Sequence, residues 1–240
     1  MNIIKAGVRN EFIKLISRKK YQILIVLTLF LSIGINMLST LGNVLTNSSL
    51  VVLSSITGFI LPLMIAMAAA DLFTAEQEDG SIKAILTRPI SRIKIFTSKI
   101  LAIFIYSITV LLIGYLSSVI YCILLNFEGL ANIWEITLSY AVSIVPMFTI
   151  VLFSAVISQL CKNSSSTVMI SVFSYMAIVV IGIIFSNISP MLFTSYTGWY
   201  KLFIGASMPL ANIFNILILL IGYTLIFFAA GLISFEKKEY

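Results

Sequence analysis

The chain has no histidine and only two cysteines among its 240 residues. Without histidine, a His-dependent metal site, a proton relay through histidine and a Ser-His catalytic pair are all excluded. Cys122 is expected near one end of a predicted membrane helix, and Cys161 near the opposite end of the next. A disulfide needs Cα atoms within about 7 Å, so these cysteines cannot pair, and they cannot form a zinc site. We therefore expect no catalytic, cofactor-binding or metal-binding residue in this chain.

Charge is also scarce: 10% of the residues are charged, whereas 60% are hydrophobic. A soluble chain carries about 25% charged residues, so this one could not cover a soluble core with polar surface. The net charge of +6 could suggest nucleic acid, but the basic residues flank apolar runs and are not interleaved with aromatic residues. Composition therefore predicts an all-α polytopic membrane protein with a single transmembrane domain, surrounded by membrane lipids and binding no nucleic acid.

Six apolar runs are long enough to cross a bilayer, which takes about 20 helical residues. They are 21–41, 50–70, 100–125, 136–160, 167–185 and 212–234. Charged residues stand at the ends of these runs and none lies in the middle of one. The sequence thus predicts six transmembrane helices.

The distribution of Lys and Arg predicts the orientation. With six spans the termini share a side, and that side also holds the basic residues of 1–20, 71–99, Lys162, Lys237 and Lys238. The opposite side has Lys201 alone. By the positive-inside rule, both termini are expected in the cytoplasm. A cleaved signal peptide is not expected, because the first apolar run is too long for one.

The stretch 186–211 is rich in aromatic residues but is interrupted by Pro190, Gly198, Lys201 and Pro209. We expect short re-entrant or interfacial helices here, on the outer face before the sixth span. Irregular backbone at membrane depth is tolerated only where it is buried in protein.

Residues 1–20 place apolar side chains at helical spacing, with basic residues mostly on the other side. This pattern predicts an amphipathic helix lying along the inner leaflet. A basic orienting cluster without a fixed helix is the alternative.

A charged segment, 76–99, separates the second and third spans. Asp79 can cap a short helix with an apolar stripe of Ile82, Ile85 and Leu86, and Pro89 suits the first turn of a second helix. We expect a short cytoplasmic helix held between two membrane helices, at which a partner would dock.

The chain has no GxxxxGK[ST] phosphate-binding loop, so it cannot itself hydrolyse ATP. Membrane-embedded acids typical of proton-coupled carriers are also missing. A sodium-coupled carrier stays open, with Gly58 and Pro62 as candidates, although Pro62 is better explained as a helix kink. An intramembrane enzyme is a weaker alternative, because its only nearby acidic pair, Glu128 and Glu135, falls in a loop.

The charged segment resembles one motif of a known family. Glu76, Gly80-Ser81, Leu86-Thr87, Pro89, Ser91-Arg92 and Lys99 are similar to the E, GT or GS, LLT, P, SR, K pattern of the ABC transporter type-2 permeases. The six spans, the basic N-terminal helix and the interrupted segment before the last span also resemble that family.

The resemblance implies a permease subunit of a bacterial ABC exporter in the cytoplasmic membrane. It implies two copies of an ATPase subunit, which bind ATP and Mg, and a second permease chain, either identical or homologous. The residues it assigns to ATPase coupling are Glu76, Gly80, Ser81, Ile82, Ile85, Leu86, Pro89 and Arg92.

By the same resemblance, the second and fifth spans face a central cavity. The translocation path would then include Ser54, Thr57, Leu61, Met64, Thr167, Ser171, Tyr175 and Ile178, although ordinary helix packing also explains these residues. A path without fixed charge suits a hydrophobic or amphipathic cargo, such as an antimicrobial peptide, a lipid or a drug. Export of such a peptide would give a producing cell resistance to it.

Overall fold

The computed structural model describes residues 2–41, 48–82, 90–125, 133–204 and 210–238. Within these ranges the chain forms helices and no strand, which confirms the all-α class. Six helices are long and apolar enough to cross a membrane, and they are numbered here as spans 1 to 6. Their bounds are Lys19–Leu38, Ser48–Glu78, Arg92–Leu124, Ile133–Leu160, Ser164–Ile184 and Leu210–Lys237. The prediction of six spans is confirmed, and the chain is a multi-pass membrane protein.

Several spans are built from more than one helical element. The elements are α1 (Asn2–Ile16), α2 (Lys19–Leu41), α3 (Ser48–Ser55), η1 (Ile56–Ile60), α4 (Leu61–Ala69), η2 (Ala70–Thr74), α5 (Ala75–Glu78), α7 (Arg92–Leu125), α8 (Ile133–Val142), α9 (Ile144–Leu160), α10 (Ser164–Ile184), η4 (Ser189–Met191), η5 (Phe193–Phe203) and α11 (Leu210–Lys237). Span 2 runs from α3 to α5, and span 4 consists of α8 and α9.

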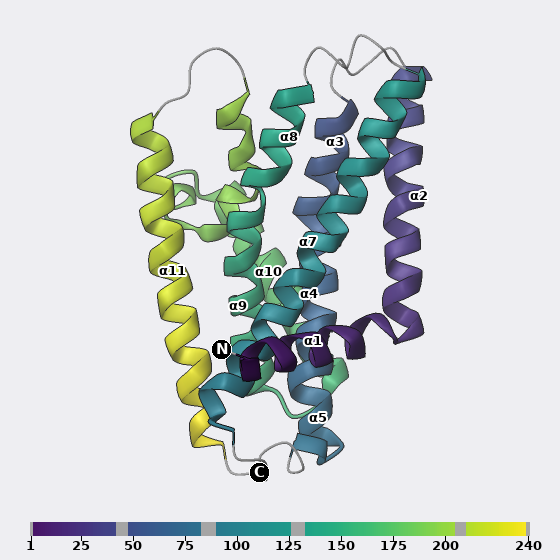
Figure 1. Ribbon diagram of the computed structural model, residues 1–240. Helices are drawn as coiled ribbons and strands as arrows, with labels where there is room; N and C mark the ends of the chain where they lie inside the picture. Colours follow the sequence, from purple (N-terminus) through teal and green to yellow (C-terminus); the bar gives the residue numbers. More distant parts are fainter. Residues whose placement is uncertain (1, 42–47, 83–89, 126–132, 205–209, 239–240) are drawn as a thin grey trace.

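The spans form one bundle, with both chain termini near its lower end in Figure 1. We call this the terminal end; it holds α1, α5 and the start of α7. The upper end is called the far end. Spans 2, 3 and 4 supply most of the buried core, whereas spans 1, 5 and 6 expose large apolar side chains along their lengths. Such an apolar surface suits a bilayer or contact with another membrane helix.

Span 2 contains two π-helical turns, η1 and η2. In η1 the N–H of Leu61 donates to the carbonyl of Ile56, five residues earlier. The next residue is Pro62, which has no N–H to donate to the carbonyl of Gly58, four residues before it. The hydroxyl of Tyr175 on α10 donates to that carbonyl at 3.3 Å. The irregular backbone of span 2 is therefore stabilised by a side chain from span 5.

The N-terminal helix α1 packs on α7 and lies across its lower part (Figure 1). Leu15 is fully buried and Phe12 packs against the core, while Lys5 and Arg9 are exposed. Gly7 permits the contact with α7, because a Cβ at this position would lie 3.1 Å from Cβ of Ser98. Part of the face that was expected to meet lipid thus packs on protein.

The segment before span 6 forms two short 3-10 helices, η4 and η5, with non-helical backbone at Gly198. It lies beside the upper parts of α9 and α11, and Phe193, Trp199 and Tyr200 are buried. The indole N–H of Trp199 donates to the carbonyl of Val142 at 3.1 Å. These contacts keep the interrupted segment against the bundle.

Span 6 joins span 3 through aromatic packing near the terminal end. The ring of Phe96 on α7 has centroids of Phe73, Phe228 and Phe235 within 5.6–5.7 Å. Gly231 faces the same ring, and a Cβ there would lie 2.7 Å from its Cζ atom. The close approach of α11 to α7 therefore requires a glycine at this position.

Candidate functional site

The connection between spans 2 and 3 begins with a tight turn at the terminal end. Asp79 ends α5, its N–H donating to the carbonyl of Ala75 at 2.9 Å, and Gly80 follows with φ of 69°. This left-handed conformation favours glycine, because a Cβ would clash with the backbone. Helical structure resumes at Ser81 and Ile82. Gly80 therefore sets the direction in which the chain leaves span 2.

The structure describes only part of the coupling segment predicted from the sequence. Ser81 and Arg92 are exposed, whereas Ile82 is buried, as its place in an apolar stripe predicts. Ile85, Leu86 and Pro89 lie outside the described residues.

A buried ion pair joins spans 2 and 3 directly behind this turn. Nζ of Lys99 on α7 lies 2.6 Å from Oε2 of Glu76 on α5, and it also donates to the carbonyl of Leu72 at 2.7 Å. Glu76 is 2% exposed and the Lys99 side chain is fully buried. A buried charge is costly unless it is paired, so the two side chains hold each other in place.

Helix α1 supplies two more charges to this pair. Lys14 binds the other carboxylate oxygen of Glu76, and Oε1 of Glu11 lies 3.6 Å from Nζ of Lys99. We call Glu11, Lys14, Glu76 and Lys99 the four-charge cluster. It contains two carboxylates and two ammonium groups, and it connects α1, span 2 and span 3.

A second polar contact fixes the corner between α1 and α2. Oδ2 of Asp71 on span 2 accepts a hydrogen bond from the hydroxyl of Tyr21 at 2.6 Å. The same oxygen lies 2.8 Å from Nη1 of Arg18 and 2.5 Å from Nζ of Lys20. The last turn of α1 and the first turn of α2 are therefore both tied to span 2.

The C-terminus completes the contacts at this end. Arg92 donates to the carbonyl of Glu236 at 2.5 Å, and Nζ of Lys238 donates to the carbonyl of Gln159 at 2.8 Å. Burial lowers the pKa of Lys238 from its ordinary value. Oε2 of Glu78 accepts from the backbone N–H of Ser164 at 3.0 Å. A displacement of α5 would thus reach spans 3, 4, 5 and 6.

Glu76 and Lys99 belong to the charged segment at which a partner was predicted to dock, and both are buried. Glu76 cannot present its carboxylate to a partner's surface, because Lys14 and Lys99 occupy both oxygens. The roles of Glu11, Asp71 and Lys99 were missed. One signal was available for Asp71 and Lys99, since each directly adjoins an uncharged run at Ala70 or Ile100.

The residues of the predicted translocation path lie largely inside the single chain. Six of them are buried, Ile178 is half-buried and Ser54 is exposed; the buried ones are Thr57, Leu61, Met64, Thr167, Ser171 and Tyr175. Oγ1 of Thr167 donates to Oγ1 of Thr74 at 3.0 Å, across the contact between spans 5 and 2. Thr167 and Tyr175 therefore lie where spans 2 and 5 pack together. The part of the eight residues in transport stays a prediction.

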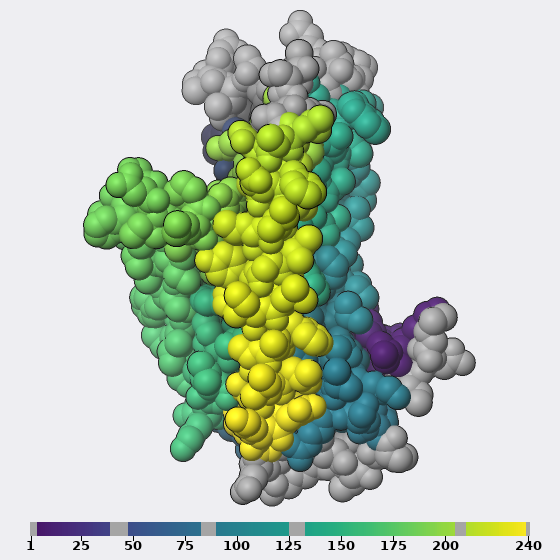
Figure 2. Space-filling view, turned by 90° about the vertical axis from the view of Figure 1, so that its left-hand side faces the viewer, coloured from purple at the N-terminus to yellow at the C-terminus, as the bar shows by residue number. Residues whose placement is uncertain are grey.

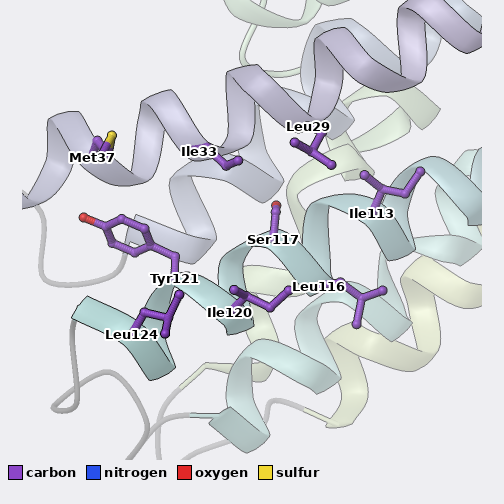
Figure 3. Close-up of a pocket in the computed structure, with 9 residues that line it drawn as sticks. All are labelled: Leu29, Ile33, Met37, Ile113, Leu116, Ser117, Ile120, Tyr121 and Leu124. Carbon is purple, nitrogen blue, oxygen red and sulfur yellow. The ribbon is translucent and has the colours of Figure 1, made fainter.

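A large apolar groove lies between α2 and α7 toward the far end, with a volume of about 460 Å³ (Figure 3). Two of the lining residues, Ser117 and Tyr121, carry a hydroxyl group. The hydroxyl of Ser117 is already hydrogen-bonded to that of Ser32 at 2.6 Å and to the carbonyl of Gly114 at 2.9 Å. Leu29, Ile33 and Leu116 are among the side chains that line it. The groove thus offers mainly hydrocarbon contacts on the lipid-facing side of the bundle.

The fold and the terminal-end contacts define a multi-pass membrane protein with a connected cluster of charges between its second and third spans. Residues 8–178 match the family model described as ABC-2 family transporter protein, and the chain belongs to that family. It is therefore a membrane permease of an ABC transporter, and membership implies a partner ATPase. A comparison with curated proteins finds no match.

Proposed function

We propose that the chain is the membrane-spanning subunit of an ATP-driven exporter for a hydrophobic or amphipathic substrate. Two ATPase subunits bind ATP and Mg, and two permease chains, identical or homologous, enclose the path between them. Both termini face the cytoplasm of a bacterial cell. Family membership favours this reading over a sodium-coupled carrier.

The observation that carries the proposal is the position of the four-charge cluster behind the Gly80 turn. An ATPase that pushes on the exposed residues of this turn, such as Asp79 and Ser81, moves α5. Glu76 then transmits that movement to α7 through Lys99 and to α1 through Lys14. The buried carboxylate acts as a link inside the permease, while neighbouring exposed residues make the contact.

Lys99 also has an alternative partner. Its Nζ lies 2.6 Å from Glu76 and 3.6 Å from Glu11, so a small shift of α5 could transfer the ammonium from one carboxylate to the other. Because the charge stays paired in both arrangements, the exchange avoids the cost of an isolated buried ion. Two such arrangements would suit inward-open and outward-open states.

The cargo is proposed from the sequence of the spans, whose middle parts carry no charged residue. The exposed face of α10, which includes Met169, Ile170 and Phe173, is the proposed contact with the second permease chain. An antimicrobial peptide, a lipid or a drug fits a path of this chemistry better than a small ion does.

The first experiment purifies the tagged chain from its native membrane in mild detergent and identifies copurifying proteins by mass spectrometry. We expect a soluble ATPase with a phosphate-binding loop. Its absence, together with substrate movement that follows a sodium gradient, would contradict the proposal.

The second experiment reconstitutes the complex in proteoliposomes and measures ATP hydrolysis and movement of a fluorescent amphipathic probe. Glu76→Gln is expected to keep the ATPase bound and hydrolysing ATP while probe movement is lost. Glu135→Gln is the matched control, because Glu135 lies on α8, away from the terminal end and outside the cluster. Probe movement that is unchanged in Glu76→Gln would count against the transmission role.

A further inference from the structure

A second groove lies at the far end, between η5 and the first turns of α11, with a volume of about 690 Å³. Figure 2 shows the green segment that carries η4 and η5 standing out beside the upper part of α11, drawn in yellow. Unlike the groove of Figure 3, it is lined by polar as well as apolar side chains: Lys201, Asn212 and Asn215 lie with Trp199, Ile216 and Leu219.

Most of the polar groups around this groove already have partners. The hydroxyl of Ser195 is 3.0 Å from that of Ser189, and the hydroxyl of Tyr196 donates to the carbonyl of Pro190 at 2.5 Å. The indole N–H of Trp199 is bonded to Val142. These groups shape the wall of the groove and leave little hydrogen-bonding capacity for a ligand.

Three polar side chains of the groove are different. Within the part of the chain that the structure describes, Lys201 makes no ion pair, and the side-chain amides of Asn212 and Asn215 make no hydrogen bond. Lys201 is also the one basic residue at the far end among the described residues. One ammonium and two amide NH₂ groups are donors that together suit a phosphate group.

The depth of these residues matches the boundary between headgroups and hydrocarbon. Helix α11 has 28 residues, so it is about 42 Å long, and it is longer than the hydrocarbon core of about 30 Å. Asn212 and Asn215 lie in its first two turns, and Ile216 and Leu219 lie deeper along the same helix. The groove is therefore polar at headgroup depth and apolar below it.

We propose that this groove binds an anionic phospholipid. The phosphate is held by Lys201, Asn212 and Asn215, and the upper part of an acyl chain packs on Leu219, next to the buried Ile216 and Trp199. A long Lys side chain reaching to headgroup level and aromatic residues at the interface are both favourable there. The inference does not rest on the proposed transport function or on which leaflet the far end meets, because six spans place both ends at an interface.

Trp199 is a built-in probe of the groove, because the chain has two tryptophans and Trp134 can be replaced. In a Trp134→Phe background, the protein is reconstituted in phosphatidylcholine vesicles with increasing fractions of a bromine-labelled lipid, which quenches nearby tryptophan. Brominated phosphatidylglycerol is compared with brominated phosphatidylcholine. We expect half-maximal quenching of Trp199 at an about tenfold lower fraction of phosphatidylglycerol. Both lipids have a phosphate, but the quaternary ammonium of phosphatidylcholine repels the Lys201 ammonium, whereas phosphatidylglycerol carries no positive charge.

Lys201→Gln is expected to abolish this preference, and Lys201→Arg to keep it. Lys162→Gln is the matched control, because Lys162 is an exposed lysine at the terminal end. The proposal is overturned by equal quenching from the two lipids, which would indicate a groove filled by water or by any lipid. It is also overturned if Lys162→Gln loses the preference as Lys201→Gln does, or if soluble glycerol phosphate relieves the quenching, which would indicate a site for free phosphate.

Discussion

The ammonium of Lys99 and the carboxylate of Glu76 meet at 2.6 Å, although 22 residues separate them in the chain, and they lie in the last turn of span 2 and near the start of span 3. Both side chains are shielded from solvent, because Glu76 is 2% exposed and Lys99 is fully buried. This pair connects the two spans that flank the connection where the ATPase is proposed to act. It makes the end of span 2 and the start of span 3 one mechanical unit.

Removing one member of this pair should destabilise the permease more than removing both. Lys99→Met leaves Glu76 as a buried carboxylate with only Lys14, and breaking a buried ion pair costs about 3–5 kcal/mol. The double variant Glu76→Gln, Lys99→Met should recover much of that loss. Fluorescence-detected size-exclusion chromatography after heating in detergent measures the thermal stability of the single and the double variant. Lys94→Met is the control, because Lys94 is exposed. Equal and additive losses would show that the two residues are not coupled.

Gly80→Ala should disturb the exit from span 2, because alanine in the left-handed region costs about 1–2 kcal/mol. Gly80→Asn should be milder, since asparagine tolerates this conformation better. We expect less ATPase subunit to copurify with the alanine variant than with the asparagine variant. The same order should appear in the thermal stability of the two proteins. Indistinguishable variants would show that the φ of 69° is not required.

Gly231→Ala should separate α11 from α7, because the added Cβ would lie 2.7 Å from Cζ of Phe96. Overpacking of this kind typically costs about 1–3 kcal/mol, so the thermal midpoint should fall. Gly222→Ala on the same helix is the control, because nothing lies within 4 Å of a Cβ there. That variant should be neutral or slightly stabilising, since alanine favours a helix. A fall of equal size in both would rule out the Phe96 contact as the cause.

Cysteine labelling can test the predicted orientation directly. Cys122 and Cys161 are both buried, so the wild-type chain should react weakly with a membrane-impermeant maleimide. Lys201→Cys should be labelled in intact cells, whereas Lys162→Cys should be labelled only after the membrane is opened. Both side chains are exposed at opposite ends of the bundle. The reverse pattern would place the termini outside the cytoplasm.

The six spans could be predicted from the sequence because hydrophobicity over about 20 residues is a local property. The interrupted segment around Gly198 could be anticipated for a similar reason, since Gly and Pro limit helix length locally. A coupling segment was predicted from its residue pattern, and its residues Ser81 and Arg92 are exposed. Its predicted contact with an ATPase still awaits the experiments above.

The sequence by itself determined the class of protein, the number of spans and the position of the charged connection. Only the tertiary structure decided which charges are buried, because pairing depends on how helices cross and not on the residues beside each charge. Glu11, Glu76 and Lys99 come from three separate elements, and they are brought together by the passage of α1 across α7. The packing of spans 2 and 5 likewise placed Tyr175 against the backbone of Gly58. Local composition sets what can cross a membrane, whereas the free energy of burying a charge or a carbonyl depends on the partner that the fold supplies.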